Sequence, residues 1–152
     1  MTEPLNPEMF ESLNFFLKGN QAAVQLALDL IFLAHSVDDL YDKDVDRSKE
    51  DIKVTFKKLF VDMPHNLFYQ QFYPQLSTLI ASAYLMWCNS TEFESGDIND
   101  KFICFHIRNA TMNIINHMIF LVGGSDWAES QGASFWKLFS PKIEKWEEFL
   151  QE

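Results

Sequence analysis

Glycine and proline are scarce in this chain, since each occurs only five times. A loop-rich β protein needs many more of these turn-forming residues, so the composition disfavours that class. No run of alternating apolar and polar residues bounded by turn signals predicts a strand. With 152 residues, 47% of them apolar, the chain is long enough to bury the core of one domain. We therefore predict a single all-α domain over residues 1–152.

Cysteine is equally scarce, with Cys88 and Cys104 both in apolar stretches that are typical of helices. Two distant cysteines exclude a zinc site built on cysteine clusters. The start, Met1 to Pro4, has neither the basic nor the apolar region of a signal peptide, which favours a reducing compartment. No apolar run approaches the roughly 18 residues of a membrane span. We expect a cytoplasmic protein with no membrane partner.

Basic residues are outnumbered by acidic ones, 12 against 22, and the formal net charge is -10. Such a surface repels phosphate backbones, so we expect no nucleic-acid partner. It is compatible with divalent cations and with basic protein partners. The sequence also lacks a glycine-rich phosphate loop, a G-x-S-x-G nucleophile motif and the paired Glu-x-x-His helices of ferritin-type di-iron sites.

Capping and stop signals divide the chain into about seven predicted helices in a bundle, three of them long and apolar. These signals include the N-caps Asn6 and Asn20, a capping box of Ser48 with Asp51, and a stop at Gly123-Gly124. The three long ones are expected at about 21–42, 65–88 and 100–122. Within the second, Pro74 is expected to produce a kink or a split. The shorter helices are expected at about 7–18, 49–62, 125–139 and from 141 onward. The 49–62 helix is predicted to end before Pro64 and to bury the apolar residues Ile52, Phe56, Leu59 and Phe60.

The end of the first long helix is rich in acidic residues. Steps of three and four residues place four potential metal ligands on one face, namely His35, Asp38, Asp39 and Asp42. Carboxylates are disfavoured by the negative end of a helix dipole, and a bound cation reverses that penalty. The cluster therefore predicts a Mg²⁺ or Mn²⁺ site. The alternative is a frayed, solvated helix end.

The segment from Asp38 to Asp42 reads Asp-Asp-Leu-Tyr-Asp and matches the pattern DDxxD. In this respect it resembles the first metal-binding motif of the isoprenoid (terpenoid and polyprenyl diphosphate) synthases. The resemblance covers about 20 residues and implies that Asp38, Asp39 and Asp42 hold Mg²⁺ ions that grip a diphosphate. The sequence has no second DDxxD motif. The chain is also about half the length usual in that family, so a degenerate or half-size relative fits better than an active synthase.

A calcium loop starting at Asp42 is a rival interpretation of the same region. Its acidic residues and Ser48 fall at alternate positions. However, Arg47 stands where such a loop requires glycine, and Lys53 stands where it requires the bidentate glutamate. These two departures disfavour an EF-hand.

A second polar stripe is predicted on the 100–122 helix. Its residues recur at helical spacing and are candidates to line a pocket, namely His106, Asn109, Asn113 and His117, with Asn116 beside them. Buried amides and imidazoles need partners. We expect this stripe to face the aspartates across a shared cavity; the alternative is an ordinary wet helix face.

Two functions follow from these features. The first is a metal-binding domain that handles a diphosphate-bearing small molecule, with Mg²⁺ or Mn²⁺ neutralising the leaving charge. The second is a non-enzymatic accessory protein that docks on a basic or apolar patch of a protein partner. Under the second hypothesis, the expected exposed anchors are Trp127, Trp136 and Trp146.

Overall fold

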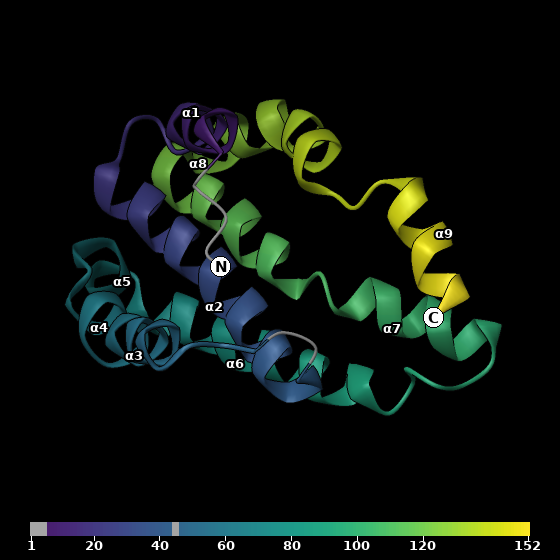
Figure 1. Cartoon of the computed structure of the whole chain (residues 1–152). Helices are drawn as coiled ribbons and strands as arrows, with labels where there is room; N and C mark the ends of the chain where they lie inside the picture. Colours follow the sequence, from purple (N-terminus) through teal and green to yellow (C-terminus); the bar gives the residue numbers. More distant parts are fainter. Residues whose placement is uncertain (1–5, 44–45) are drawn as a thin grey trace. The chain divides into compact units, whose positions relative to one another are not determined.

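The computed structural model describes residues 6–43 and 46–152, and its secondary structure is all-α, as predicted (Figure 1). No strand occurs within these two ranges. No helix there is both long and apolar enough to cross a membrane. The chain divides into two compact units. The first comprises the residues up to Tyr73 together with Leu121–Gly123, and the second comprises Pro74–Phe120 and Gly124–Glu152. A single domain over 1–152 stays a prediction.

The first unit is organised around α2, which contacts α1, α5 and the π-helix η1. Its elements are α1 (Pro7–Phe16), α2 (Gln21–Asp42), α3 (Lys49–Lys57), η1 (Lys58–Asp62), α4 (Met63–His65) and α5 (Leu67–Gln71). Asn6 and Asn20 cap α1 and α2, because their side chains accept hydrogen bonds from backbone N–H groups that have no partner within the helix. The bounds of α2 agree with the predicted helix at 21–42.

The buried core of the first unit comes mainly from α2. Its buried apolar residues are Ala23, Val24, Leu26, Ala27, Leu28, Leu30 and Leu33. Asp29 lies among them and is buried as well. A buried carboxylate requires a compensating cation or hydrogen bonds. An element that packs against α2 at Asp29 must therefore supply such a partner in addition to apolar contacts.

The helical segment after Ser48 differs from the prediction in two ways. It does not end before Pro64 but passes through η1 into α4. Proline has no N–H, and its ring crowds the carbonyl four residues earlier, which is that of Phe60. The Met63 N–H bonds to the Lys58 carbonyl, five residues back. This wider spacing defines a π turn, and the proline next to it accounts for the lost α-helical register.

The second difference concerns which face of this segment is buried. Phe56 and Phe60 were predicted to be buried but are exposed, whereas Thr55 is buried. Ile52 and Leu59, the other two residues predicted to be buried, are half-buried. The segment is thus rotated so that the two phenylalanines face outward. Its inward face is the one that carries Thr55 and Lys58.

The second unit contains the remaining helices, apart from Tyr73 of α6 and Leu121–Gly123 of α8. They are α6 (Tyr73–Thr91), α7 (Ile98–Ile107), α8 (Ala110–Phe139) and α9 (Ile143–Gln151), with α6 beginning at the unit boundary. Helices α7 and α9 lie side by side (Figure 1). Phe105 joins them, since its ring lies 5.1 Å from that of Trp146 and 5.8 Å from that of Phe149. Aromatic pairs at such distances add to the stabilisation that burial alone provides.

Two of the three predicted long helices are interrupted. The 65–88 helix is divided at Phe72 into α5 and α6, and Pro74 lies in the first turn of α6, where proline is tolerated. The 100–122 helix is divided at Arg108 and Asn109. The predicted stop at Gly123-Gly124 is present as a kink, because Gly124 adopts φ 83° and ψ 179°. That positive φ favours glycine.

Candidate functional site

The aspartate-rich end of α2 is helical through Asp42, so the predicted ligands keep their three- and four-residue spacing. His35 is exposed, while Asp38, Asp39 and Asp42 are half-buried. Lys43 ends the helix in the left-handed conformation, and its N–H donates to the Asp39 carbonyl at 3.0 Å. The frayed helix end considered in the sequence analysis is therefore not what the structure has.

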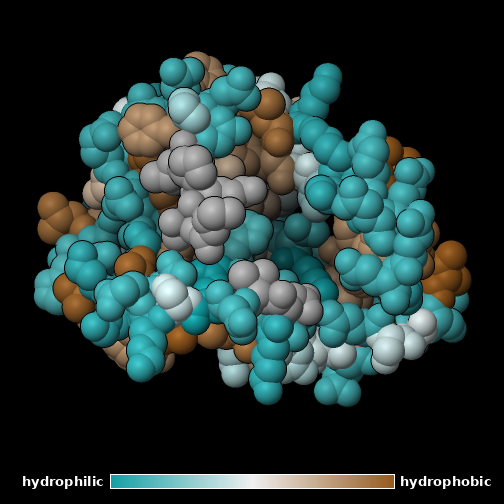
Figure 2. Space-filling view, viewed as in Figure 1, coloured by the Kyte–Doolittle hydropathy of each residue, from teal (hydrophilic) through white to brown (hydrophobic). Residues whose placement is uncertain are grey.

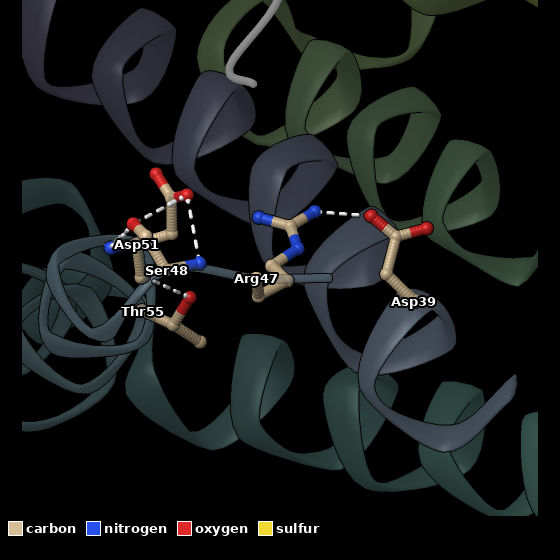
Figure 3. Close-up of polar contacts among 5 residues, drawn as sticks. All are labelled: Asp39, Arg47, Ser48, Asp51 and Thr55. Atoms are coloured by element: carbon tan, nitrogen blue, oxygen red, sulfur yellow. Dashed lines mark hydrogen bonds and ion pairs between the residues drawn. The ribbon is translucent and has the colours of Figure 1, made fainter. Parts of the chain in front are cut away.

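Asp39 has a cationic partner that the sequence analysis did not identify. The Arg47 side chain turns back from the segment before α3 and forms an ion pair with the Asp39 carboxylate (Figure 3). The Arg47 side chain is only 10% exposed and that of Asp39 is 31% exposed. The guanidinium thus supplies the positive charge that a bound cation was expected to supply at this carboxylate. It also offsets the unfavourable position of Asp39 near the helix C-terminus.

This pairing bears on the metal hypothesis. Within the part of the chain that the structure describes, no three His, Cys, Asp or Glu side chains form a group able to hold a metal ion. Ion pairing with Arg47 also competes with metal ligation for the Asp39 oxygens. A Mg²⁺ or Mn²⁺ site at His35, Asp38, Asp39 and Asp42 stays a prediction, as does the diphosphate chemistry that depends on it.

Ser48 begins α3 with the predicted capping box. The Asp51 N–H donates to the Ser48 hydroxyl at 3.1 Å, and that hydroxyl donates to the Asp51 carboxylate at 2.8 Å (Figure 3). The hydrogen bond from Ser48 lowers the pKa of Asp51, because it favours the ionised carboxylate. The capping residue Ser48 follows Arg47 directly, so the same turn positions both the cap and the ion pair.

The second predicted stripe does not lie on one helix, because the break at Arg108 and Asn109 separates it. His106 belongs to α7, whereas Asn113 and His117 belong to α8. The Asn109 side chain donates to the Phe105 carbonyl at 2.8 Å, an acceptor that a continuous helix would give to the Asn109 backbone N–H. The expectation of one continuous polar stripe is therefore wrong.

Two of these polar side chains lie within hydrogen-bond distance of backbone carbonyls of α7. Asn109 donates to that of Phe105, and the His106 Nδ1 lies 2.9 Å from the Phe102 carbonyl. The half-buried Asn109 amide therefore needs no carboxylate partner to offset its burial. His106 and Asn113 are exposed, while Asn109 and His117 are half-buried. These residues lie in the second unit and the aspartates in the first. A shared pocket between them stays a prediction.

The charged pair that organises the first unit was missed in the sequence analysis. Lys58, the first residue of η1, donates from Nζ to Asp29 Oδ1 at 2.6 Å, and the Gln25 amide donates to the same oxygen at 3.0 Å. The Asp29 side chain is only 2% exposed and that of Lys58 is 20% exposed. Lys58 also lies over the Phe32 ring, 5.2 Å from its centre. Asp29 is the only charged residue among residues 21–34. This isolated charge in an apolar helix is the sequence feature that indicates a buried ion pair.

The Asp29–Lys58 pair explains why Phe56 of α3 and Phe60 of η1 face outward. Lys58 must face α2 to reach the buried carboxylate, and Thr55 precedes it by one helical step. Phe56 and Phe60 are consequently 51% and 70% exposed. Their rings stack with centres 5.9 Å apart and an interplanar angle of 15°. We call the surface around them the α3–η1 face, made up of Lys53, Val54, Phe56, Lys57, Phe60 and Val61, all exposed.

The three tryptophans expected to be exposed anchors are not exposed. Trp127, Trp136 and Trp146 are each half-buried. Trp136 packs against Phe135, with ring centres 5.4 Å apart, and Trp146 packs against Phe105. The rings of Trp136 and Trp146 therefore serve the packing of the second unit. In the region that α3, α4 and α5 occupy in Figure 1, Figure 2 shows apolar residues at the surface among hydrophilic ones.

Comparisons with known proteins add no family to these observations. No family model, curated protein or solved structure matches this chain. The resemblance to the isoprenoid synthases at Asp38 to Asp42 stays a prediction.

Proposed function

We propose that this chain is a non-enzymatic interaction protein that binds a protein partner through the α3–η1 face. The observation that carries the proposal is the stacked, exposed pair of Phe56 and Phe60. Covering a Phe side chain stabilises a complex by about 1.5–3 kcal/mol, so exposed rings are costly unless a partner covers them. Aromatic residues are also enriched at the centres of protein interfaces.

The support for this face is that its exposure follows from the fold. Lys58 holds η1 against α2 through the buried Asp29, and this pairing keeps Phe56 and Phe60 outward. The Ser48 cap and the Arg47–Asp39 ion pair fix the start of α3. A partner therefore meets a preformed helical surface, which lowers the entropy cost of binding. We place this function in the cytoplasm, because cysteines on helices suit a reducing compartment.

Affinity purification from the cells that make the protein tests the proposal. The tagged wild type is compared with Phe56→Ser/Phe60→Ser and with Phe15→Ser, which alters an exposed ring on α1 of the same unit. We expect a defined set of proteins to copurify with the wild type and with Phe15→Ser but not with the double variant. Equal recovery by all three chains contradicts the proposal. Thermal midpoints within about 2 °C of one another confirm that folding is not the cause.

A further inference from the structure

We infer that the α3–η1 face binds an acidic, amphipathic segment of the partner protein, an inference that rests on the proposed function. The whole chain is acidic, which by itself favours a basic partner. The α3–η1 face itself carries two lysines, Lys53 and Lys57, and no acidic residue. Residues 47–58 hold five of the 12 basic residues and two of the 22 acidic ones, but Arg47 and Lys58 are paired with Asp39 and Asp29 and add no net charge to the face. The remainder of the chain is therefore still more acidic than its net charge of -10 indicates.

Lysines and aromatic rings alternate on the α3–η1 face. Helical steps of three and four residues link Lys53 to Phe56 and Lys57, and link both of these to Phe60. Val54 and Val61 extend the apolar part of the surface to one side. A ligand that covers the rings must therefore come close to both ammonium groups. An apolar partner surface without acids would leave these groups beside it with less water and no counter-charge.

The two lysines remain available to a partner. Lys53 pairs with Glu50 at 3.3 Å, and Lys57 pairs with Asp62 at 3.6 Å. The side chains of both lysines are mostly exposed, and exposed pairs of this kind contribute little stability. A carboxylate of the partner can displace or share these contacts at small cost. The acids of the partner must lie beside apolar side chains, because the lysines and rings of the face are interleaved.

Charged groups on the protein attract or repel a ligand only over short distances in salt solution. The Debye length is about 8 Å at physiological salt, so acids elsewhere on the chain are largely screened from a ligand seated on α3 and η1. The same acids oppose the approach of an acidic ligand to other parts of the surface. The charge distribution therefore favours the α3–η1 face over the rest of the chain for such a ligand.

Binding of a synthetic peptide to the full chain tests the inference. The probe is an amphipathic helix of about five turns built from Leu and Glu, and the matched probe has Lys in place of every Glu. We expect saturable binding of the Glu peptide, weakened about tenfold or more between about 50 and 500 mM NaCl. The Lys peptide should bind at least tenfold more weakly than the Glu peptide at low salt. Equal binding of the two peptides, or no binding of the Glu peptide, overturns the inference.

Variants assign the binding to this face. Lys53→Glu/Lys57→Glu and Phe56→Ser/Phe60→Ser should each weaken binding of the Glu peptide about tenfold or more. Lys137→Glu/Lys142→Glu, which changes the net charge equally in the second unit, should leave it within about twofold. Lys53→Gln/Lys57→Gln repeats the test with a milder change if charge reversal impairs folding. Equal effects of the two charge-reversal pairs overturn the inference.

Two further arms separate this inference from other outcomes. Binding to phosphatidylcholine vesicles only when they contain phosphatidylserine, with no binding of the Glu peptide, would assign the face to a lipid surface and overturn the inference. If the partners recovered from cells are lost with Phe56→Ser/Phe60→Ser but retained with Lys53→Glu/Lys57→Glu, the acidic class is wrong and the proposed function stands. If neither variant loses partners, the proposed function itself fails.

Discussion

Replacing Lys58 by Met tests whether the Asp29–Lys58 pair holds η1 against α2. The change removes the cation from a buried pair and keeps the length of the side chain. The Asp29 carboxylate, 2% exposed, would lose its 2.6 Å bond to Lys58 and keep the one from Gln25. Removing one partner of a fully buried pair costs about 3–5 kcal/mol. The 20% exposure of Lys58 and the remaining amide bond reduce this to about 2–4 kcal/mol.

That loss is a large fraction of the about 5–15 kcal/mol that stabilises an ordinary domain. Urea unfolding followed by circular dichroism measures it as a lower midpoint with an unchanged slope. Lys57→Met is the matched control, because Lys57 is 67% exposed and pairs with Asp62 only at 3.6 Å. It should cost less than about 1 kcal/mol.

Asp29→Asn combined with Lys58→Met should recover a large part of the loss, since no unpaired carboxylate is then buried. If Lys58→Met costs no more than Lys57→Met, or if adding Asp29→Asn makes it worse, the pair does not hold η1 against α2. The stated reason for the exposure of Phe56 and Phe60 would then be wrong.

Three further predictions concern the end of α2 and the start of α3. Asp39→Asn should lower the free energy of unfolding by about 1–2 kcal/mol in urea titrations, because it leaves the mostly buried Arg47 without its carboxylate; an increase would show that repulsion among the acids dominates. If the predicted site at the end of α2 binds metal, millimolar Mg²⁺ or Mn²⁺ should raise the thermal midpoint by several degrees over that in EDTA, and Asp38→Asn/Asp39→Asn should abolish the rise; a midpoint within about 1 °C of that in EDTA would contradict the predicted site. Because the pKa of Asp51 is lowered in the fold, its contribution is present above the ordinary value of 3.8 and is lost as pH falls through the lower folded value. Ser48→Ala should therefore reduce the loss of stability between about pH 5 and pH 2, and unchanged acid titration of stability would contradict this assignment.

Local signals in the sequence predicted much of the secondary structure. The capping asparagines and the capping box fixed the starts of three helices, and the glycine pair located the kink in α8. These signals act over a few residues, so they can be read without knowing the tertiary structure. The break at Asn109 was harder to predict, because it depends on a side-chain bond to the carbonyl of Phe105.

The exposed face of α3 and η1 could not be predicted from apolar spacing. Ile52, Phe56, Leu59 and Phe60 form a regular stripe, and such a stripe is normally buried. Here the inward face is decided by the requirement of Asp29 for a cation, a contact across 29 residues of sequence. The lone charge in an otherwise apolar helix was visible, but the choice of Lys58 among neighbouring lysines depends on the tertiary fold.

The central claim is that a protein partner covers Phe60, and photo-crosslinking in living cells tests it most directly. Benzoyl-phenylalanine replaces Phe60 in one sample and Phe15, an exposed ring on α1, in the other. The proposal predicts discrete crosslinked species at Phe60 that are absent at Phe15 and that disappear when Phe56→Ser is added. The absence of crosslinks at Phe60, or the same species from both positions, would contradict it.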